Sequence, residues 1–235
     1  MIALAVDAIV LDIEGTTAPI AFVHDVLFPF AAARLEGAVA ARGADPDVAA
    51  AVAALETERA GDREVTAPDV VAYAHALMRI DRKSTGLKAL QGLIWRDGYR
   101  EGALRAELFA DVAPAFAAWR AAGVTIASYS SGSIAAQQLL YRHSDAGDLA
   151  AGIAAWFDTT TGPKREAASY ARIASALGVA PARIAFVSDL VAELVAARAA
   201  GMIGVLSVRP GNAAVDDAEG FAVTSSLAAL TLTPG

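Results

Sequence analysis

The sequence predicts an α/β protein: a doubly wound parallel sheet with an all-helical segment inserted after its first strand. Two observations support this prediction. Several short runs are apolar throughout, as expected of strands buried on both faces of a sheet, and helical stretches, most of which end in glycine, separate the later ones. A long block nearer the N-terminus has helical patterns only. Alternation of strands and helices is typical of βαβ units and therefore of a parallel sheet.

Four apolar runs are expected to form the main strands, and a shorter candidate lies between the second and the third. In chain order they cover 8–12, 124–130, 155–160, 184–189 and 203–208. The helices predicted beside them cover 112–123, 133–142, 165–178 and 190–201. Three of these helices end at a glycine, which suits the left-handed conformation that often follows a helix. The tail from residue 209 is expected to be a loop followed by a last apolar strand or helix.

The segment from about residue 21 to residue 104 breaks this alternation. Its patterns predict helices over 25–43, 45–60, 67–81 and 84–99, and no run in it reads as a strand. The pairs Asp45-Pro46 and Ala67-Pro68 favour helix starts, because proline is well tolerated at the first helical position. We therefore expect residues 1–20 and 105–235 to form a core domain, with residues 21–104 as a helical cap that closes over the sheet.

The composition excludes several classes of function. The chain has 235 residues, 56% of them hydrophobic, and a net charge of -7, which argues against a nucleic-acid partner and against anionic membranes. The absence of cysteine excludes disulfides, thiolate catalysis and zinc–thiolate or iron–sulfur sites, and the three scattered histidines are expected to be structural. We find no secretion signal and no apolar run of the ~20 residues that a membrane span needs. A cytoplasmic, monomeric protein is the expectation.

Polar residues follow the predicted strands at their carboxyl ends, where ligands bind in an open α/β sheet. Asp12 and Glu14 lie one residue apart after the first strand, and a Gly-Thr-Thr turn follows them. Lys164 follows the short strand, and Asp189 ends the next, with Glu193 a helical turn later. The second strand is followed by Ser130, Ser131, Gly132 and Ser133. Carboxylates at two strand ends, hydroxyl groups at a helix N-terminus and one lysine are complementary to a phosphate and a divalent metal.

Each of these groups has a possible role in phosphoryl transfer. Asp12 can attack phosphorus to form an aspartyl-phosphate, provided that a hard cation such as Mg²⁺ neutralises the phosphate. The Ser130 hydroxyl and the backbone N–H groups of residues 131–133, which open a helix, can bind the phosphoryl oxygens. Lys164 offsets the remaining negative charge. Glu14 is placed to protonate the leaving oxygen and then to take a proton from water.

Taken singly, each residue also has a structural interpretation. Asp12 could simply end a strand, the Ser-Ser-Gly-Ser segment could be a turn with an N-cap serine, and Lys164 could be a solvated residue at a helix start. Asp189 could be an N-cap, and Glu193 could either support the site or lie on a helix surface. The functional interpretation depends on the combination, because four site elements occur in this order, each directly after a predicted strand or short turn.

That order resembles the haloacid dehalogenase-like phosphatase superfamily, whose pattern is Asp-x-Asp-x-Thr or Val, then Ser or Thr, then Lys, then an acidic cluster. This sequence departs from the pattern in having Glu14 as the second acid. "DIEGTT" followed by "PIAFVHDVLFPFA" is similar to one branch, the enolase-phosphatases (acireductone synthases) of methionine salvage. The resemblance continues through "LQGLIWRDGY", "YSSGSIAAQQLL", "FDTTTGPKREAASYARIA", "FVSD" and "VRPGNA", and so covers nearly the whole chain.

The resemblance implies a two-step reaction on 2,3-diketo-5-methylthiopentyl-1-phosphate, which is enolised and then hydrolysed to acireductone and phosphate. It also implies one Mg²⁺ per chain. Asp12 would be the nucleophile and a metal ligand, Glu14 the acid/base and a metal ligand, and Asp189 a metal ligand. Substrate contacts would come from Ser130, Ser131, Gly132 and Lys164. For the enolisation base, Glu14 is the first candidate and His24, Asp25 and Tyr99 are weaker ones. Phe22, Phe28 and Trp95 could line an apolar pocket or belong to a core.

Three other functions remain open. A haloacid dehalogenase shares the fold and the nucleophile but attacks carbon without Mg²⁺, and Glu14 and Asp189 argue against it. A general sugar-phosphate phosphatase would use the same residues on another substrate. A binding module that keeps the phosphate site without catalysis is disfavoured by the intact Asp12, Lys164 and Asp189.

Overall fold

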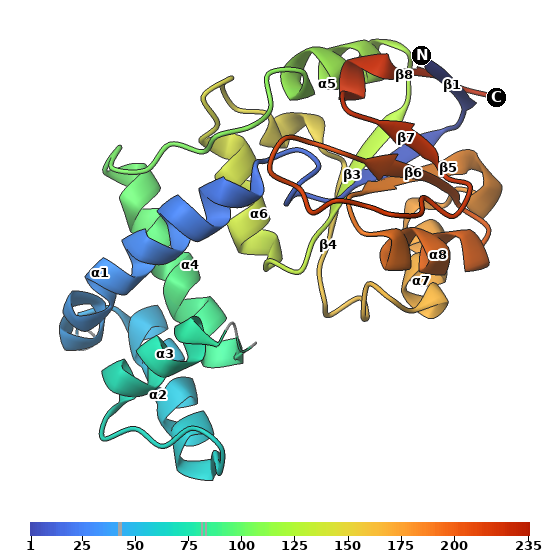
Figure 1. The fold of residues 1–235 in the computed structure, drawn as a ribbon. Helices are drawn as coiled ribbons and strands as arrows, with labels where there is room; N and C mark the ends of the chain where they lie inside the picture. Colours follow the sequence, from blue (N-terminus) through green and yellow to red (C-terminus); the bar gives the residue numbers. More distant parts are fainter. Residues whose placement is uncertain (42–43, 81, 83) are drawn as a thin grey trace. The chain divides into compact units, whose positions relative to one another are not determined.

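The computed structural model describes residues 1–41, 44–80, 82 and 84–235. The chain divides into two compact units, Met1–Phe22 with Arg105–Gly235 and Val23–Leu104. The first unit holds the sheet and the second is built from helices (Figure 1). These bounds lie within two residues of the division expected from the sequence. Each unit has a hydrophobic core of its own.

The first unit contains a six-stranded parallel sheet, which confirms the predicted fold class. Its strand order is β4-β3-β2-β5-β6-β7, so β2 lies between β3 and β5. The strands are β2 (Ala8–Leu11), β3 (Thr125–Tyr129), β4 (Ala155–Phe157), β5 (Ile184–Ser188), β6 (Ile203–Ser207) and β7 (Ala222–Thr224). Every residue of β2 and β5 is buried, as expected where helices cover both faces of a sheet.

The helices of this unit lie where the sequence predicts them. They are α5 (Val112–Ala121), α6 (Ile134–Arg142), α7 (Ala167–Leu177) and α8 (Val191–Ala199). Figure 1 shows α7 and α8 on one face of the sheet and α5 and α6 on the other. Aromatic rings pack together in the helical layers on both faces of the sheet. Phe116 of α5 stacks on Tyr141 of α6 with centroids 5.9 Å apart, and Tyr170 of α7 lies 5.0 Å from Phe186 of β5.

The two ends of the chain form a second, smaller sheet that the sequence did not predict. The strand β1 (Ile2–Ala5) pairs in parallel with β8 (Leu230–Thr233). The opening apolar run is therefore two strands, separated near Asp7, whose carboxylate pairs with Arg183. The last apolar segment is a strand rather than a helix. Because β1 and β8 are more than 200 residues apart in the chain, their pairing leaves no local pattern in the sequence.

Two further strand predictions need correction. The strand expected over 155–160 ends at Phe157, because the Asp158 carboxylate accepts hydrogen bonds from the N–H and hydroxyl groups of Thr160 and turns the chain. The edge strand β7 was expected to be loop. Two of its three residues are exposed, so it lacks the apolar run by which the inner strands were recognised.

The second unit is helical, with no strand among its described residues. A π-helical stretch, η1 (Phe22–Leu27), leads into α1 (Phe28–Ala40), and α2 (Pro46–Gly61), α3 (Val70–Arg79) and α4 (Thr85–Arg100) follow. The N-cap residues Asp45, Asp69 and Ser84 accept backbone N–H groups. Pro46 opens α2 as predicted, whereas Pro68 lies outside α3. The predicted ends at 42–43 and 81 fall outside the described residues.

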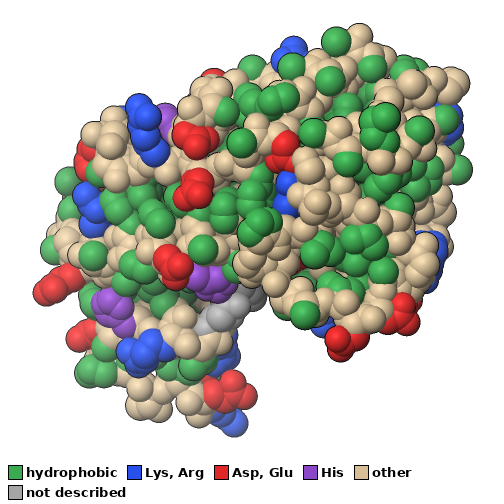
Figure 2. Space-filling view, turned by 45° about the horizontal axis from the view of Figure 1, so that its top comes forward, with side chains coloured by type: hydrophobic (Ala, Val, Ile, Leu, Met, Phe, Trp, Pro, Cys, Tyr) green, Lys and Arg blue, Asp and Glu red, His purple; other side chains and the backbone are tan. Residues whose placement is uncertain are grey.

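Charged side chains of both signs are mixed on the face of the molecule drawn in Figure 2. On the face drawn in Figure 2, Lys and Arg side chains are scattered among acidic and apolar ones rather than gathered into a continuous patch. None of the helices is long and apolar enough to cross a membrane, as far as the described residues show.

In the helical unit, α4 packs closely on α2 at a glycine. A Cβ atom at Gly86 would lie 2.7 Å from the backbone nitrogen of Leu55 and 3.1 Å from the carbonyl oxygen of Ala51. Gly92, two turns later in the same helix, has no such neighbour within 4 Å. The close approach of α2 and α4 therefore requires glycine at position 86 but not at position 92.

We expect Gly86→Ala to destabilise the protein by about 1–3 kcal/mol, because α2 must move away from the new methyl group. Gly92→Ala is the matched control and should stabilise by up to ~1 kcal/mol through helix propensity. Urea denaturation followed by circular dichroism measures both changes. A Gly86→Ala variant at least as stable as the wild type would contradict the close packing of α2 on α4.

Candidate active site

The carboxyl ends of three neighbouring strands carry the predicted site residues. Asp12 directly follows β2, Ser130 follows β3 and Asp189 follows β5. Because β2 lies between β3 and β5 (Figure 1), the residues that follow these strands lie at the same edge of the sheet. The register pairs Leu11 with Ser128 and with Val187, so Ser130 and Asp189 both extend one residue further along the sheet than Asp12 does.

A buried lysine lies between two carboxylates at this edge. Lys164 Nζ is 2.8 Å from Asp12 Oδ1 and 2.7 Å from Glu193 Oε2, and less than a tenth of each side chain is exposed. Burial lowers the pKa of Lys164, but the charges of Asp12 and Glu193 outweigh this effect and raise it to about 12. The lysine is therefore a permanent positive charge beside Asp12, as the functional interpretation requires.

Glu193 belongs to this site more directly than the sequence indicated. Its carboxylate contacts Lys164 and lies 2.9 Å from the Ser188 hydroxyl, which in turn is 3.4 Å from Asp12 Oδ2. Burial, and then the charge of Asp12, raise the pKa of Glu193. The interpretation of Glu193 as a helix-surface acid is wrong. Its position in the first turn of α8, four residues after Asp189, was the signal that could have identified it.

Asp189 is the third carboxylate of this cluster. Burial and the charges of Asp12 and Glu193 raise its pKa to about 7. Three carboxylates thus lie around one ammonium group, and their negative charge exceeds the positive charge that Lys164 supplies. An excess of carboxylate oxygen next to a phosphate site is what a divalent, oxygen-seeking cation would offset.

The donor set fits Mg²⁺, which usually takes one or two carboxylates and completes its shell with water and substrate phosphate. Asp12 and Asp189 supply that number. Among the described residues, no three His, Cys, Asp or Glu side chains form a ready-made metal cage. Glu14, the third predicted ligand, lies in the turn after Asp12, where its backbone forms an isolated β-bridge with Ala18. Its role as a ligand stays a prediction.

The turn after β2 is rigid and requires glycine. The Ile13 carbonyl accepts the N–H groups of Thr16, Thr17 and Ala18 at 2.9–3.1 Å. Gly15 has a φ of +67°, and a Cβ atom there would lie 2.6 Å from Asp189 Oδ2. Both the left-handed backbone and the approach of the Asp189 carboxylate exclude a side chain at this position.

The serine segment after β3 opens α6 as predicted. Ser130 is buried, its hydroxyl accepts the N–H of Gly132, and Ser133 accepts the N–H of Ala136 as the N-cap. The carboxylate of Asp158, the first residue after β4, accepts the N–H of Ile134 and ties this segment to the neighbouring strand. Sequence reasoning did not single out Asp158, although it follows its strand just as Asp12 follows β2.

Lys164 is held from its backbone as well as from its side chain. The Tyr170 hydroxyl donates to the Lys164 carbonyl at 2.6 Å, and Lys164 Nζ lies 5.7 Å from the centroid of the Tyr129 ring. Both tyrosines belong to the core beneath the sheet edge. The structure therefore places Asp12, Lys164 and Asp189 together, with Ser130 on the adjacent strand.

Comparison with known proteins identifies the family. A model of the haloacid dehalogenase-like hydrolases matches residues 6–201. Proteins named Enolase-phosphatase E1 from Synechococcus elongatus and Sorangium cellulosum are 52% and 51% identical to this chain, each over 91% of it and over 93% and 92% of their own lengths. The chain belongs to the enolase-phosphatase family of haloacid dehalogenase-like hydrolases. This membership confirms the predicted family and enzyme class, a phosphatase.

Solved structures agree with this membership. The UTR4 protein of Saccharomyces cerevisiae is 32% identical, with a TM-score of 0.78 over 94% of this chain and 98% of that one. The CbbY protein of Rhodobacter sphaeroides, solved with xylulose-1,5-bisphosphate, has a TM-score of 0.60 at 18% identity, which indicates a common fold alone. This haloacid dehalogenase-like hydrolase therefore shares its architecture with proteins of quite different sequence.

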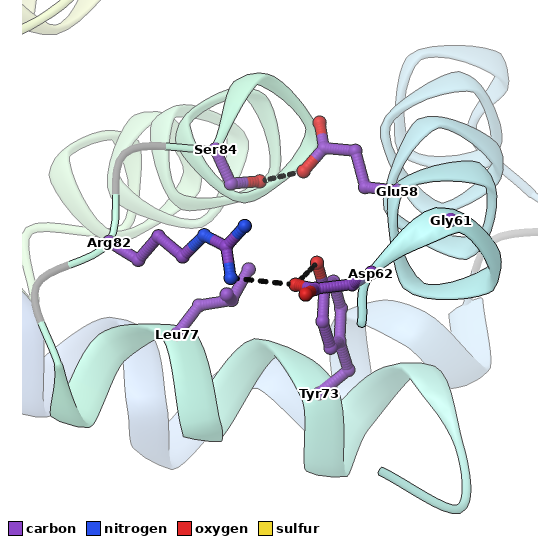
Figure 3. A pocket seen from close by; sticks show the side chains of 7 residues that line it. All are labelled: Glu58, Gly61, Asp62, Tyr73, Leu77, Arg82 and Ser84. Carbon is purple, nitrogen blue, oxygen red and sulfur yellow. Dashed lines mark hydrogen bonds and ion pairs between the residues drawn. The ribbon is translucent and has the colours of Figure 1, made fainter. Parts of the chain in front are cut away.

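A separate hollow of about 220 Å³ lies in the helical unit of this hydrolase (Figure 3). Its lining residues are Glu58, Gly61, Asp62, Tyr73, Leu77, Arg82 and Ser84. Asp62 Oδ2 accepts the Tyr73 hydroxyl at 2.8 Å and lies 2.9 Å from Arg82 Nη1. Ser84 donates to Glu58 across the hollow. Because these polar groups pair with one another, we interpret them as a link between α2, α3 and α4 rather than as a ligand site.

This link should make stability depend on pH. The N–H of Glu64, with support from the Tyr73 hydroxyl and Arg82, lowers the pKa of Asp62 to about 2. A carboxyl whose pKa is lowered on folding contributes stability above its ordinary pKa near 4 and loses it as the pH falls towards 2. We expect Asp62→Asn to be less stable than the wild type at pH 7 and to lose less stability on acidification to pH 3.

Urea denaturation at the two pH values measures this dependence. Glu56→Gln, at an exposed position of α2, is the matched control and should keep the wild-type dependence. An unchanged difference between pH 7 and pH 3 in Asp62→Asn would show that the network around Asp62 contributes nothing to stability.

Proposed function

We propose that this enzyme is a Mg²⁺-dependent enolase-phosphatase of L-methionine salvage. Its substrate would be 2,3-diketo-5-methylthiopentyl-1-phosphate, which it would convert through an enol phosphate to acireductone and inorganic phosphate. The observation that carries the proposal is the buried Asp12–Lys164–Glu193 cluster at the strand ends, with Asp189 beside it. The relatives' name, Enolase-phosphatase, supports the two-step reaction. A cytoplasmic, monomeric state stays a prediction.

In this proposal the hydrolytic half-reaction begins at Asp12. Its Oδ1 lies 2.8 Å from Lys164 Nζ and accepts the N–H of Ile13 at 2.8 Å, whereas Oδ2 accepts the Ser188 hydroxyl at the longer distance of 3.4 Å. We assign the attack on phosphorus to Oδ2. A P–O bond forms to Asp12 as the ester P–O bond breaks, and the leaving oxygen takes a proton from Glu14. Water, losing its proton to Glu14, then attacks the aspartyl-phosphate and releases phosphate.

The other groups bind and neutralise the phosphate. Mg²⁺, when bound, supplies charge neutralisation and polarises a phosphoryl oxygen, and Asp12, Glu14 and Asp189 are its proposed ligands. Lys164 compensates charge on the same side as Asp12. The Ser130 hydroxyl and the N–H group of Ser131 are proposed to bind phosphoryl oxygens. They lie before the N-terminus of α6, whose partial positive charge favours an anion. The Gly132 N–H donates to Ser130 Oγ at 3.1 Å, so it would bind phosphate only by leaving that partner.

Enolisation requires a base that removes a proton next to a carbonyl group. Glu14 is the base that we propose, and it would then serve both half-reactions. Burial raises the pKa of Tyr99 far above its ordinary value, so this phenol keeps its proton at neutral pH and is a poor base. His24 and Asp25 remain weaker candidates. In the helical unit Phe28 stacks on Trp95 with centroids 6.5 Å apart, and Trp95 packs against the core of that unit.

A two-wavelength assay that separates enol formation from phosphate release tests this function. We expect both steps with the diketone phosphate, loss of phosphate release in EDTA, and a much lower kcat/KM with common sugar phosphates. Equal use of sugar phosphates would favour a general phosphatase. Release of halide from 2-haloacids, unaffected by EDTA, would favour a dehalogenase. Binding of substrate with Mg²⁺ but without turnover would favour a silent binding module.

We expect Asp12→Asn to reduce phosphate release at least ~10³-fold, because the amide is not a nucleophile. The variant keeps the shape of the side chain, so its circular dichroism spectrum should match that of the wild type. Phosphate release is measured with a coupled colorimetric assay at saturating Mg²⁺. Appreciable residual hydrolysis would remove Asp12 as the nucleophile.

We expect Lys164→Met to lower kcat/KM by ~10²–10³-fold and to destabilise the protein, since Asp12 and Glu193 then repel each other without compensation. The double variant Lys164→Met/Glu193→Gln removes one of the two repelling charges. It should therefore recover stability but not activity. Thermal unfolding and steady-state kinetics separate the two effects, and an unchanged kcat/KM in Lys164→Met would place the lysine outside the site.

A further inference from the structure

The turn that carries Glu14 is held from outside by the loop after β6. The carbonyl oxygen of Gly15 accepts the Asn212 side-chain amide at 2.9 Å and the Ser207 hydroxyl at 3.1 Å. The carbonyl oxygen of Thr16 accepts Nε of Arg209 at 3.1 Å. These are the carbonyls of the two residues that directly follow Glu14. These hydrogen bonds therefore hold the backbone of the turn directly after Glu14.

Arg209 is anchored firmly enough to act as a fixed support. The residue is 6% exposed, its Nη1 lies 2.7 Å from Asp111 Oδ2, and its guanidinium carbon lies 4.5 Å from the centroid of the Phe109 ring. Phe109 also donates its own N–H to the Thr17 carbonyl at 3.0 Å. A buried guanidinium is costly unless it is paired, and Asp111 is the partner that offsets this cost. The pair fixes the position of the Nε group that binds the turn at Thr16.

Asp111 connects this support to the rest of the unit. Its Oδ2 accepts the Ser226 hydroxyl and the Leu227 N–H, both at 2.6 Å, in addition to Arg209. Hydrogen bonds to Arg209 and Ser226 hold the pKa of Asp111 below its ordinary value despite burial. The carboxylate is thus charged, and it joins Arg209 to the segment that leads into β8.

Asn212 faces two parts of the site at once. Besides the Gly15 carbonyl, its amide donates to the Ser207 carbonyl at 3.2 Å. Its Oδ1 and Asp189 Oδ2 lie 2.8 Å and 2.6 Å from the point where a Gly15 Cβ would be. The Asn212 side chain therefore packs against Gly15 on the same side as the Asp189 carboxylate. It helps to fix the distance between the turn after β2 and the end of β5.

We propose that Arg209 and Asn212 are positioning residues for the reaction, and that they fix the backbone turn through which Asp12 and Glu14 are presented. The proposal rests on the proposed function for the roles of those two acids. The physical reason is repulsion. Asp12, Glu14, Asp189 and Glu193 are four acids at one edge of the sheet, and an unfastened turn could relax by moving outwards. A displacement of about 1 Å at a reacting group can cost ~10²-fold in rate.

Arg183 provides a matched control at the opposite end of β2. It pairs with both carboxylate oxygens of Asp7 at 2.8 and 3.0 Å and donates to the carbonyl of Ala5 at 2.9 Å. Its chemistry is the same as that of Arg209, an arginine that joins a carboxylate to a backbone carbonyl, but Asp7 lies before the strand and Asp12 after it. Loss of Arg183 tests the effect of removing such an arginine without touching the turn.

The experiment compares Arg209→Met, Asn212→Ala and Arg183→Met by steady-state phosphate release and by amide hydrogen exchange. We expect the first two variants to lower kcat about 10- to 100-fold with KM within about 3-fold, and Arg183→Met to leave kcat within about 2-fold. The amides of residues 15–18 should exchange at least about 10-fold faster in the first two variants alone. Because Asn212 is partly exposed, the Asn212→Ala variant is expected to fold, and it tests the proposal by itself if Arg209→Met does not fold.

The outcomes separate this inference from the proposed function. A wild type that releases no phosphate from the diketone phosphate contradicts the proposed function, and the exchange rates then still decide whether the loop holds the turn. Unchanged exchange at residues 15–18, or a loss of kcat in Asn212→Ala no greater than in Arg183→Met, would overturn the positioning role.

Discussion

The contact on which the site depends is the buried ammonium group of Lys164 between the carboxylates of Asp12 and Glu193. Removing three charges from water is expensive, and their mutual attraction at 2.7–2.8 Å offsets that cost only while the geometry holds. Asp189 adds a further carboxylate whose pKa rises to about 7 because of burial and its acidic neighbours. Carboxylate charge therefore exceeds the charge of Lys164 at this edge of the sheet, and a divalent cation would offset the excess in the function that we propose.

The fold supplies the rigidity that this contact requires. Strand β2 lies in the middle of the sheet with every residue buried, so its end cannot move without disturbing both neighbouring strands. The residues after β2, β3 and β5 meet at one edge because parallel strands all point the same way. The Ile13–Ala18 turn then closes on the Ile13 carbonyl, and the loop after β6 fastens it from outside. The ends of β2, β3 and β5 thus place Asp12, Ser130 and Asp189, and the loop after β6 holds the turn that follows β2.

Several of the differences between expectation and structure have the same cause, a contact between residues that are distant in the chain. Asp12, Lys164 and Asp189 were recognised because each follows a strand or a short turn, which is a local property of the sequence. Glu193 was left between two interpretations because its partner, Lys164, is 29 positions away and its burial follows from how α8 packs on the sheet. The pairing of β1 with β8 and the contact of Arg209 with Thr16, 193 residues apart, likewise have no local signature. Asp158 stood in a strand-end position, and its capping of α6 was visible only once β4 and α6 were side by side.

By itself the sequence determined the class of fold, the order of most strands and helices, and the residue types at the strand ends, because hydrophobic periodicity and helix-ending glycines act over a few residues. It also carried the family, since two relatives named enolase-phosphatase are about half identical to it over nine-tenths of the chain. Only the tertiary structure decided which carboxylates share the lysine, which oxygen of Asp12 contacts it, and which residues hold the turn after Asp12. The strand order brings together residues that are distant in the chain. Their burial and their charges then raise or lower the free energy of each ionised group.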